Sequence, residues 1–94
     1  MDDPIPVSRA LAHSAHDSMV TFLRIELQIA NTMLDAAATT HDADSRERRR
    51  GRANEACAEV VRYLEADVER PVLSAEEREE LSTGLRAVQA RMAA

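Results

Sequence analysis

Apolar residues recur at helical spacing along most of this chain, in three stretches separated by turn-forming residues. The stretches cover about residues 8–38, 45–69 and 75–92. Ala, Leu, Arg and Glu fill them, and runs of alternating β-branched residues, which would indicate strands, are absent. Because short turns make consecutive helices antiparallel neighbours, the pattern predicts an all-α, up-down-up three-helix bundle with a long first helix.

The predicted boundaries follow from residues that start or stop helices. Two early prolines predict an extended tail over residues 1–7. Asp44 followed by Glu47 has the spacing of a capping box and predicts the start of the second helix.

Pro71 predicts the end of the second helix. Ser74 followed by Glu77 forms another capping box, so the third helix is expected to begin at Ala75. The 94 residues are expected to form one domain.

The first predicted helix carries two apolar stripes on roughly opposite sides. One stripe has the regular seam spacing of a helix that packs in a bundle: Val20, Leu23, Leu27, Ala30, Leu34 and Ala37. The second stripe contains Val7, Leu11, Ala15, Phe22, Ile25, Ile29 and Met33. Together they leave a polar arc of only about 100°, which is unusual for a surface helix.

The other two predicted helices have narrow stripes: Ala53, Cys57, Val60, Val61, Leu64 and Val68 in the second, and Leu81, Leu85, Val88 and Met92 in the third. We therefore expect a two-fold homodimer, or contact with another helical protein, through an interface formed by Leu11, Ala15, Phe22, Ile25, Ile29 and Met33. The alternative is that the second and third helices straddle the first and cover nearly all of it.

Glu26 lies between the two apolar stripes, where a carboxylate loses hydration. Counting antiparallel levels from the turns places it near Arg86, its predicted partner, with Asn54 or Tyr63 as neutral alternatives. Such an acid either serves a ligand or interface, or forms a structural ion pair or a solvent-wetted rim.

Two clusters suggest binding functions as alternatives to self-association. His13, His16 and Asp17 are spaced to approach one metal ion, although histidines on helix surfaces are common. Arg46, Arg48, Arg49, Arg50 and Arg52 form a basic patch for nucleic acid or an acidic partner, or simply a solvated charged face. The net charge of −5 makes nucleic acid the weaker of these partners.

Composition and missing motifs narrow the function further. The sequence contains no catalytic, cofactor or phosphate-loop motif, so we expect a protein that is not an enzyme and holds no cofactor. Cys57 falls on an apolar stripe and is expected to be a buried hydrophobe. No membrane-span or signal-peptide pattern is present, which, with a single cysteine, favours the cytoplasm.

Three motifs carry a resemblance to a group of short bacterial proteins with no known activity. Residues 26–40 read E-L-x-x-A-x-T-x-L-x-x-A-x-T-T, V-V-R-Y-L ends at Leu64, and residues 73–81 read L-S-x-x-E-R-E-E-L. The resemblance covers about residues 22–92 and implies the same three-helix order. It departs from the group at Cys57, where Tyr is usual, and at Tyr63, where Phe is usual.

Overall fold

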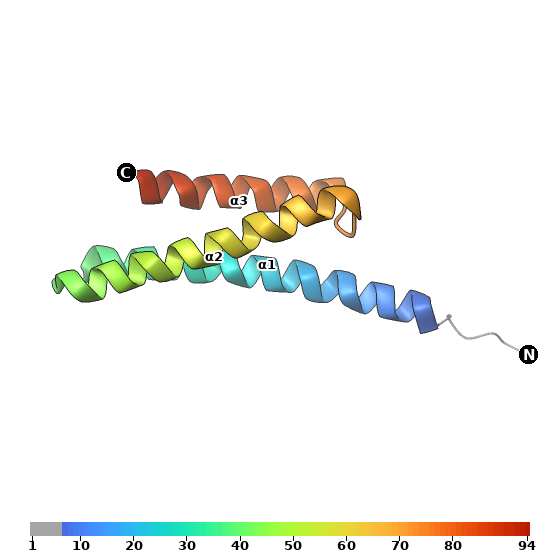
Figure 1. Cartoon of the computed structure of the whole chain (residues 1–94), viewed down its shortest axis with the longest axis horizontal. Coiled ribbons are helices and arrows are strands. Elements are labelled where there is room, and N and C mark those ends of the chain that lie inside the picture. The colour runs from blue at the N-terminus through green and yellow to red at the C-terminus, as the bar shows by residue number, and fades with distance from the viewer. Residues whose placement is uncertain (1–6) are drawn as a thin grey trace, which may run out of the picture.

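The computed structural model describes the backbone of residues 7–94 and the side chains of residues 14–94. It contains three helices, α1 (Val7–Thr39), α2 (Ala43–Glu69) and α3 (Ala75–Ala93), which run up, down and up (Figure 1). The all-α class and the long first helix are therefore confirmed. Of the tail predicted over residues 1–7, only Val7 is described, and it already belongs to α1.

Asp42 starts α2 two residues before the predicted position. Its extended backbone suits an N-cap, and its Oδ2 accepts a hydrogen bond from the Ser45 amide at 2.9 Å. Hydrogen bonding to Ser45, first with its side chain and second with this amide, holds the pKa of Asp42 below its ordinary value. The predicted capping box of Asp44 and Glu47 is wrong, because Asp44 lies within the first helical turn.

The capping box at the start of α3 is confirmed. The Glu77 amide donates to Ser74 Oγ at 3.0 Å, and Glu77 Oε1 accepts from the Ser74 amide at 2.8 Å. α3 therefore begins at Ala75, directly after the loop that contains Pro71.

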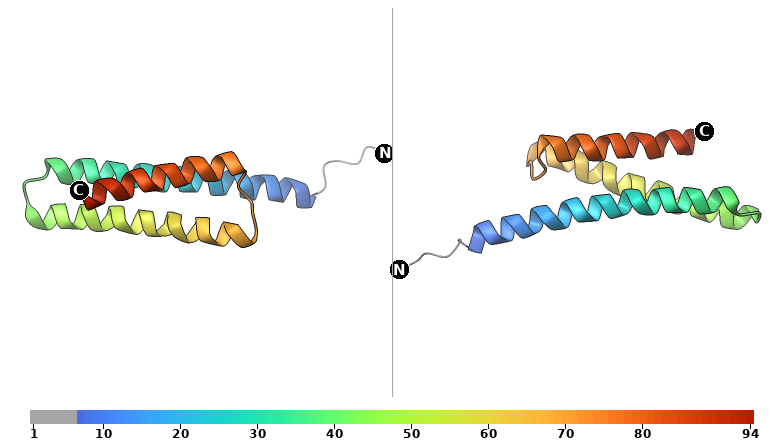
Figure 2. Two further views of the ribbon diagram at one scale, coloured as in Figure 1. Left: turned by 90° about the horizontal axis from the view of Figure 1, so that it is seen from above. Right: turned by 180° about the vertical axis from the view of Figure 1, so that it is seen from behind.

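α1 and α2 form a long antiparallel hairpin, and α3 lies along one face of it (Figure 2). The molecule measures 66 × 21 × 17 Å along its principal axes. The first turns of α1 reach past the loop between α2 and α3, and within residues 7–94 no other helix lies beside them. None of the described helices covers the face of the hairpin opposite α3 either.

The core lies between the hairpin and α3 and is built from small and medium side chains. The seam of α1 is buried as predicted, with Leu27 partly buried, and the predicted stripe of α3 is buried except for the partly exposed Met92. One position of the α2 stripe is wrong: Val68 is 70% exposed, and its neighbour Asp67 is buried instead. No helix in the described part of the chain is long and apolar enough to span a bilayer.

Candidate functional site

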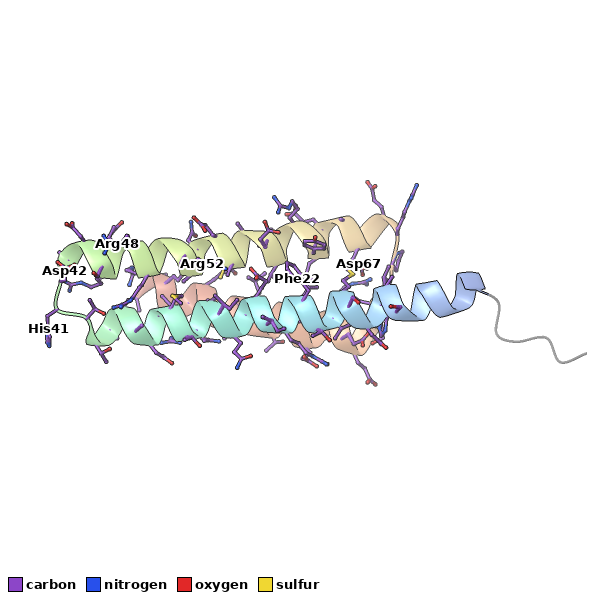
Figure 3. The ribbon with its side chains drawn as sticks, turned by 90° about the horizontal axis from the view of Figure 1, so that it is seen from below. Phe22, His41, Asp42, Arg48, Arg52 and Asp67 are labelled. Carbon is purple, nitrogen blue, oxygen red and sulfur yellow. The ribbon has the colours of Figure 1, made fainter. Side chains whose placement is uncertain are left out.

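The hairpin face opposite α3, which we name the open face, carries an exposed apolar patch centred on Phe22. Phe22, Ile25 and Tyr63 are 36%, 46% and 39% exposed. The Phe22 and Tyr63 rings, from α1 and α2, pack with centroids 5.2 Å apart and an interplanar angle of 57°. Figure 3 looks onto this face, with α3 behind the hairpin.

The residues predicted to form an interface have different surroundings in the structure. Phe22 and Ile25 are exposed on the open face, and Ala15 is exposed further along α1. Ile29 and Met33 are half-buried and pack against the core, so α2 covers part of the second stripe. The side chain of Leu11 lies outside the described residues.

The open face stays uncovered because α3 binds a polar edge of α1 instead. Both terminal oxygens of Glu80 accept hydrogen bonds from Arg24 at 2.9 Å. Further along, Arg91 donates to Asp35 at 2.6 Å and to the Asn31 side chain at 2.8 Å. Arg24, Asn31 and Asp35 lie on the polar arc that the two apolar stripes of α1 leave between them.

A sequence signal for this docking was present but missed. Arg24 and Glu80 are 56 residues apart, and so are Asp35 and Arg91. A constant offset between opposite charges is expected when two parallel helices lie side by side. The constant offset can be interpreted only when α3 is known to run parallel to α1 and to contact it.

Glu26 is buried as predicted, at 8% exposure, but its predicted pairing with Arg86 is wrong. Arg86 is exposed and lies 3.6 Å from Glu79 and 3.3 Å from the Thr83 hydroxyl, both on α3. Glu26 follows Phe22 by four residues, about one helical turn, so the two residues share a face of α1. No hydrogen bond or ion pair joins the Glu26 carboxylate to any other described residue, including Asn54 and Tyr63.

The carboxylate oxygens of Glu26 are not sealed from solvent. Among the described side chains, the one polar atom that is both fully buried and unpaired is Nε of Arg78. The oxygens of Glu26 therefore keep some contact with solvent, although the residue as a whole is 8% exposed. A helix that covered the open face would remove that solvent and would have to offer a hydrogen-bond donor.

Asp67 is a second buried carboxylate, at 2% exposure, and sequence reasoning missed it. It accepts hydrogen bonds from the Val72 amide at 2.7 Å, the Leu73 amide at 3.3 Å and the Arg78 guanidinium at 2.6 Å. Burial by itself raises the pKa of Asp67, but these hydrogen bonds outweigh it and hold the pKa below its ordinary value. Asp67 thus fixes the loop between α2 and α3.

Of the suggested metal cluster, the side chains of His16 and Asp17 are described. His16 Nε2 lies 2.8 Å from Glu77 Oε1 and its Nδ1 lies 3.2 Å from Asp17, so the ring links α1 to α3. No group of three or more potential ligands is arranged to hold a metal ion in the part of the chain that was described. The side chain of His13 lies outside it.

The arginine patch is mostly exposed, and its side chains have different partners. Arg49 donates to Thr40 and Arg48 to Ser45, at 3.0 Å, while Arg50 donates to the Met92 carbonyl at 2.8 Å. Within residues 46–52, Arg52 alone has a described carboxylate within 4.0 Å, that of Glu55. Intramolecular neutralisation of the patch is therefore incomplete.

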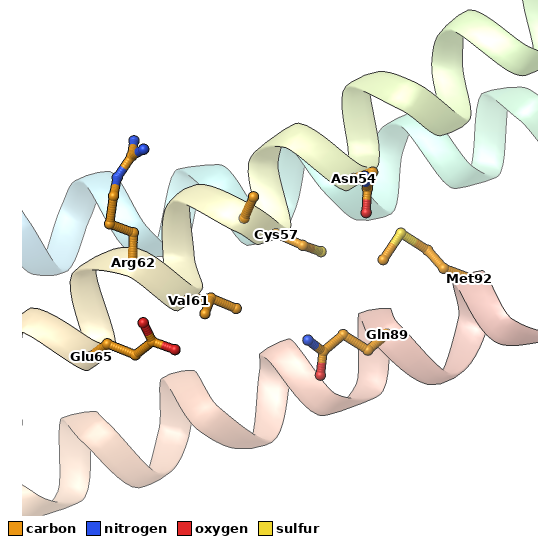
Figure 4. Close-up of a pocket in the computed structure, with 8 residues that line it drawn as sticks. Asn54, Cys57, Val61, Arg62, Glu65, Gln89 and Met92 are labelled. Carbon is orange, nitrogen blue, oxygen red and sulfur yellow. The ribbon is translucent and has the colours of Figure 1, made fainter.

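An open groove of about 520 Å³ runs between α2 and α3 (Figure 4). Its lining is apolar at Val61 and Met92, and polar at Asn54, Gln89 and Glu65 among others. Cys57, which lies at this groove, is buried as predicted and free of any disulfide. Its burial raises the pKa of the thiol, which disfavours the reactive thiolate.

Comparison of the chain with known protein families, curated proteins and solved structures finds no match.

Proposed function

We propose that this protein is a non-enzymatic interaction module that self-associates through the open face, with α1 at the centre of the interface. The observation that carries the proposal is the exposed cluster of Phe22, Ile25 and Tyr63 on a face that none of the three described helices covers. Contiguous exposed apolar patches mark interaction sites more often than single exposed side chains do.

The distribution of charge favours a second copy of the chain as the occupant. Residues 42–54, at the hairpin turn, carry five arginines and three acids. Residues 55–80, which lead to the other end, carry nine acids and three arginines. Two copies that pack antiparallel through the open face bring the basic end of each beside the acidic end of the other. A parallel arrangement would place like charges together.

The length of α1 adds to the same surface. Its 33 residues extend for about 50 Å, and its first turns project beyond the rest of the bundle. In an antiparallel pair each projecting segment runs beside the hairpin turn of the other copy, so helix pairing continues over the whole contact. A two-fold axis then uses the same residues on both chains.

The cellular setting is part of this proposal. A single, buried and free cysteine suits the reducing cytoplasm. The resemblance to short bacterial three-helix proteins points to the same setting.

Light scattering or sedimentation of the chain over a range of concentrations tests self-association. The chain should be dimeric at micromolar concentration, and Phe22→Glu should dissociate it without loss of helical content. Val68→Glu is the matched control, because Val68 is a more exposed apolar residue on α2. The control should remain dimeric.

A monomer at every concentration would refute the proposal. So would equal dissociation by the two substitutions, because that would indicate nonspecific apolar contact. If the affinity of the dimer does not fall with added salt, attraction between the basic and acidic ends does not stabilise the dimer. The open face would remain the interface in that case.

A further inference from the structure

A small pocket at the turn end of the bundle is ringed by three arginines. Arg46 and Arg50 of α2 and Arg91 of α3 surround a floor of Leu34, Ala37 and Ala38 from α1. The pocket encloses about 190 Å³, which is below the roughly 300–1,000 Å³ of sites for drug-sized ligands. Its size suits one compact group.

The three guanidinium groups keep hydrogen-bond donors available. Arg50 uses one Nη on the Met92 carbonyl, and Arg91 uses its Nη atoms on Asn31 and Asp35. The guanidinium of Arg46 makes no hydrogen bond to the described residues. Each arginine has five N–H donors in a fork that matches phosphate oxygens, so several donors remain for a ligand.

The charge around the pocket is unbalanced. Asp35 is the one described carboxylate within 4.0 Å of any of these guanidinium groups, through Arg91, which leaves an excess of two positive charges. Arg46 also lies at the end of the first turn of α2, where the helix dipole disfavours cations. A bound dianion would relieve both unfavourable terms.

We infer that this pocket binds the phosphate group of a small phosphomonoester. A phosphate monoester carries a charge of about −1.5 to −2 near neutral pH, which matches the excess. The apolar floor of Leu34, Ala37 and Ala38 lies beside the guanidinium groups and accommodates the adjoining carbon skeleton of the ester. The pocket lies on the α3 side of the hairpin, so this inference does not rest on self-association through the open face.

Calorimetric titration of the full chain with inorganic phosphate and with phenyl phosphate, at low ionic strength, tests the inference. Both probes should bind saturably with one site per chain, and phenyl phosphate more tightly because of the apolar floor. Arg46→Gln should weaken binding by about tenfold, because it removes a charged hydrogen-bond donor. Arg46 makes no described side-chain hydrogen bond, so this variant should fold normally.

Arg48→Gln is the matched control, since Arg48 lies in the same run of arginines but outside the pocket. It should bind both probes like the wild type, and Phe22→Glu should do so too. Equal weakening by Arg46→Gln and Arg48→Gln would overturn the inference and indicate diffuse attraction of anions. Absence of saturable binding to either probe, or binding of RNA with equal dependence on all five arginines of the patch, would also overturn it.

Discussion

Asp67 and Glu26 are both buried carboxylates, at 2% and 8% exposure, yet their surroundings differ. Asp67 lies where α2 meets the loop to α3 and accepts three hydrogen bonds. Glu26 lies at the seam between α1 and α2 on the open face and accepts none from the described residues. Asp67 is hydrogen-bonded within the chain and fixes the loop between α2 and α3, whereas Glu26 is left to be solvated.

The difference shows on which side of the hairpin the charged groups find partners within the same chain. On the α3 side, charged groups face each other: Arg24 meets Glu80, and Arg78 meets Asp67. On the open face, apolar side chains and one unpaired carboxylate remain at the surface. A second chain that covers the open face must therefore offer a hydrogen-bond donor to Glu26, because a carboxylate that loses hydration without a partner raises the free energy of the folded state.

The largest expected effect comes from Asp67→Asn. The substitution removes the negative charge that pairs with Arg78. It also replaces one acceptor oxygen by an NH₂ group, which would face the N–H donors of the loop or of Arg78. Breaking a buried ion pair on one side costs about 3–5 kcal/mol. Asp67 is buried but the Arg78 side chain is 37% exposed, so we expect a loss of about 2–3 kcal/mol in the free energy of unfolding. Urea denaturation followed by circular dichroism measures it.

Glu69→Gln controls for charge at the same end of α2, because Glu69 is exposed and makes no described ion pair. It should change the free energy of unfolding by less than about 0.5 kcal/mol. Similar losses in the two variants would mean that the Asp67 hydrogen bonds contribute little and that the comparison with Glu26 fails.

Glu26→Met should have the opposite sign. Methionine has a similar unbranched shape but needs no hydrogen-bond partner, so the free energy of unfolding should rise by about 1 kcal/mol, the lower range for relieving a desolvated polar group. The measurement is urea denaturation of samples dilute enough to be monomeric. A loss of stability would show that water at the open face solvates Glu26 well.

The helices and the seam of α1 were predictable because they depend on local spacing and caps. Ser74 and Glu77 act within one turn of α3, and the α1 seam repeats along one helix. The lack of a partner for Glu26 was not predictable, since levels counted from turns fix the height of a residue along the bundle and not its direction around the helix. Arg86 lies at roughly the height of Glu26 along the bundle, but its side chain does not point toward Glu26.

The role of Asp67 was hidden for a related reason. Its partners are backbone amides of the following loop and an arginine 11 residues away, and an apolar stripe analysis ignores such contacts. The apolar stripe of α2 predicts Val68 in the core, one position from Asp67, which is the residue buried there. Whether the open face meets a second copy depends on another chain and stays a prediction.

The same substitution, glycine to alanine, compares a surface that α3 covers with one that it leaves exposed. A Cβ at Gly51 meets nothing within 4 Å, so Gly51→Ala should raise the free energy of unfolding by about 0.5–1 kcal/mol. A Cβ at Gly84 would lie 3.0 Å from Leu27 Cδ1, where α3 approaches α1. Gly84→Ala should therefore raise the melting temperature less than Gly51→Ala does, as thermal denaturation measures it. Equal gains would mean that Leu27 moves aside freely and that α3 docks loosely.

The smallest expected effect is a pH dependence of α3 docking through His16. Its hydrogen bond with Glu77, and then that with Asp17, raises the pKa of His16 above the ordinary 6.5. The same bond with His16 is the main cause that lowers the pKa of Glu77 from 4.5 to about 2. Both groups lie near the surface, so salt screens the pair.

The direction of the effect follows from each shift. The raised pKa of His16 contributes stability below pH 6.5, which is lost as the pH rises through the folded-state value. The lowered pKa of Glu77 contributes stability above pH 4.5, which is lost as the pH falls toward 2. The pair therefore stabilises the docked α3 most between pH 4.5 and 6.5. Thermal melting across this range should show His16→Gln losing stability relative to the wild type there and matching it well above pH 6.5. A difference that is the same at every pH would mean that His16 acts through packing and not through its charge.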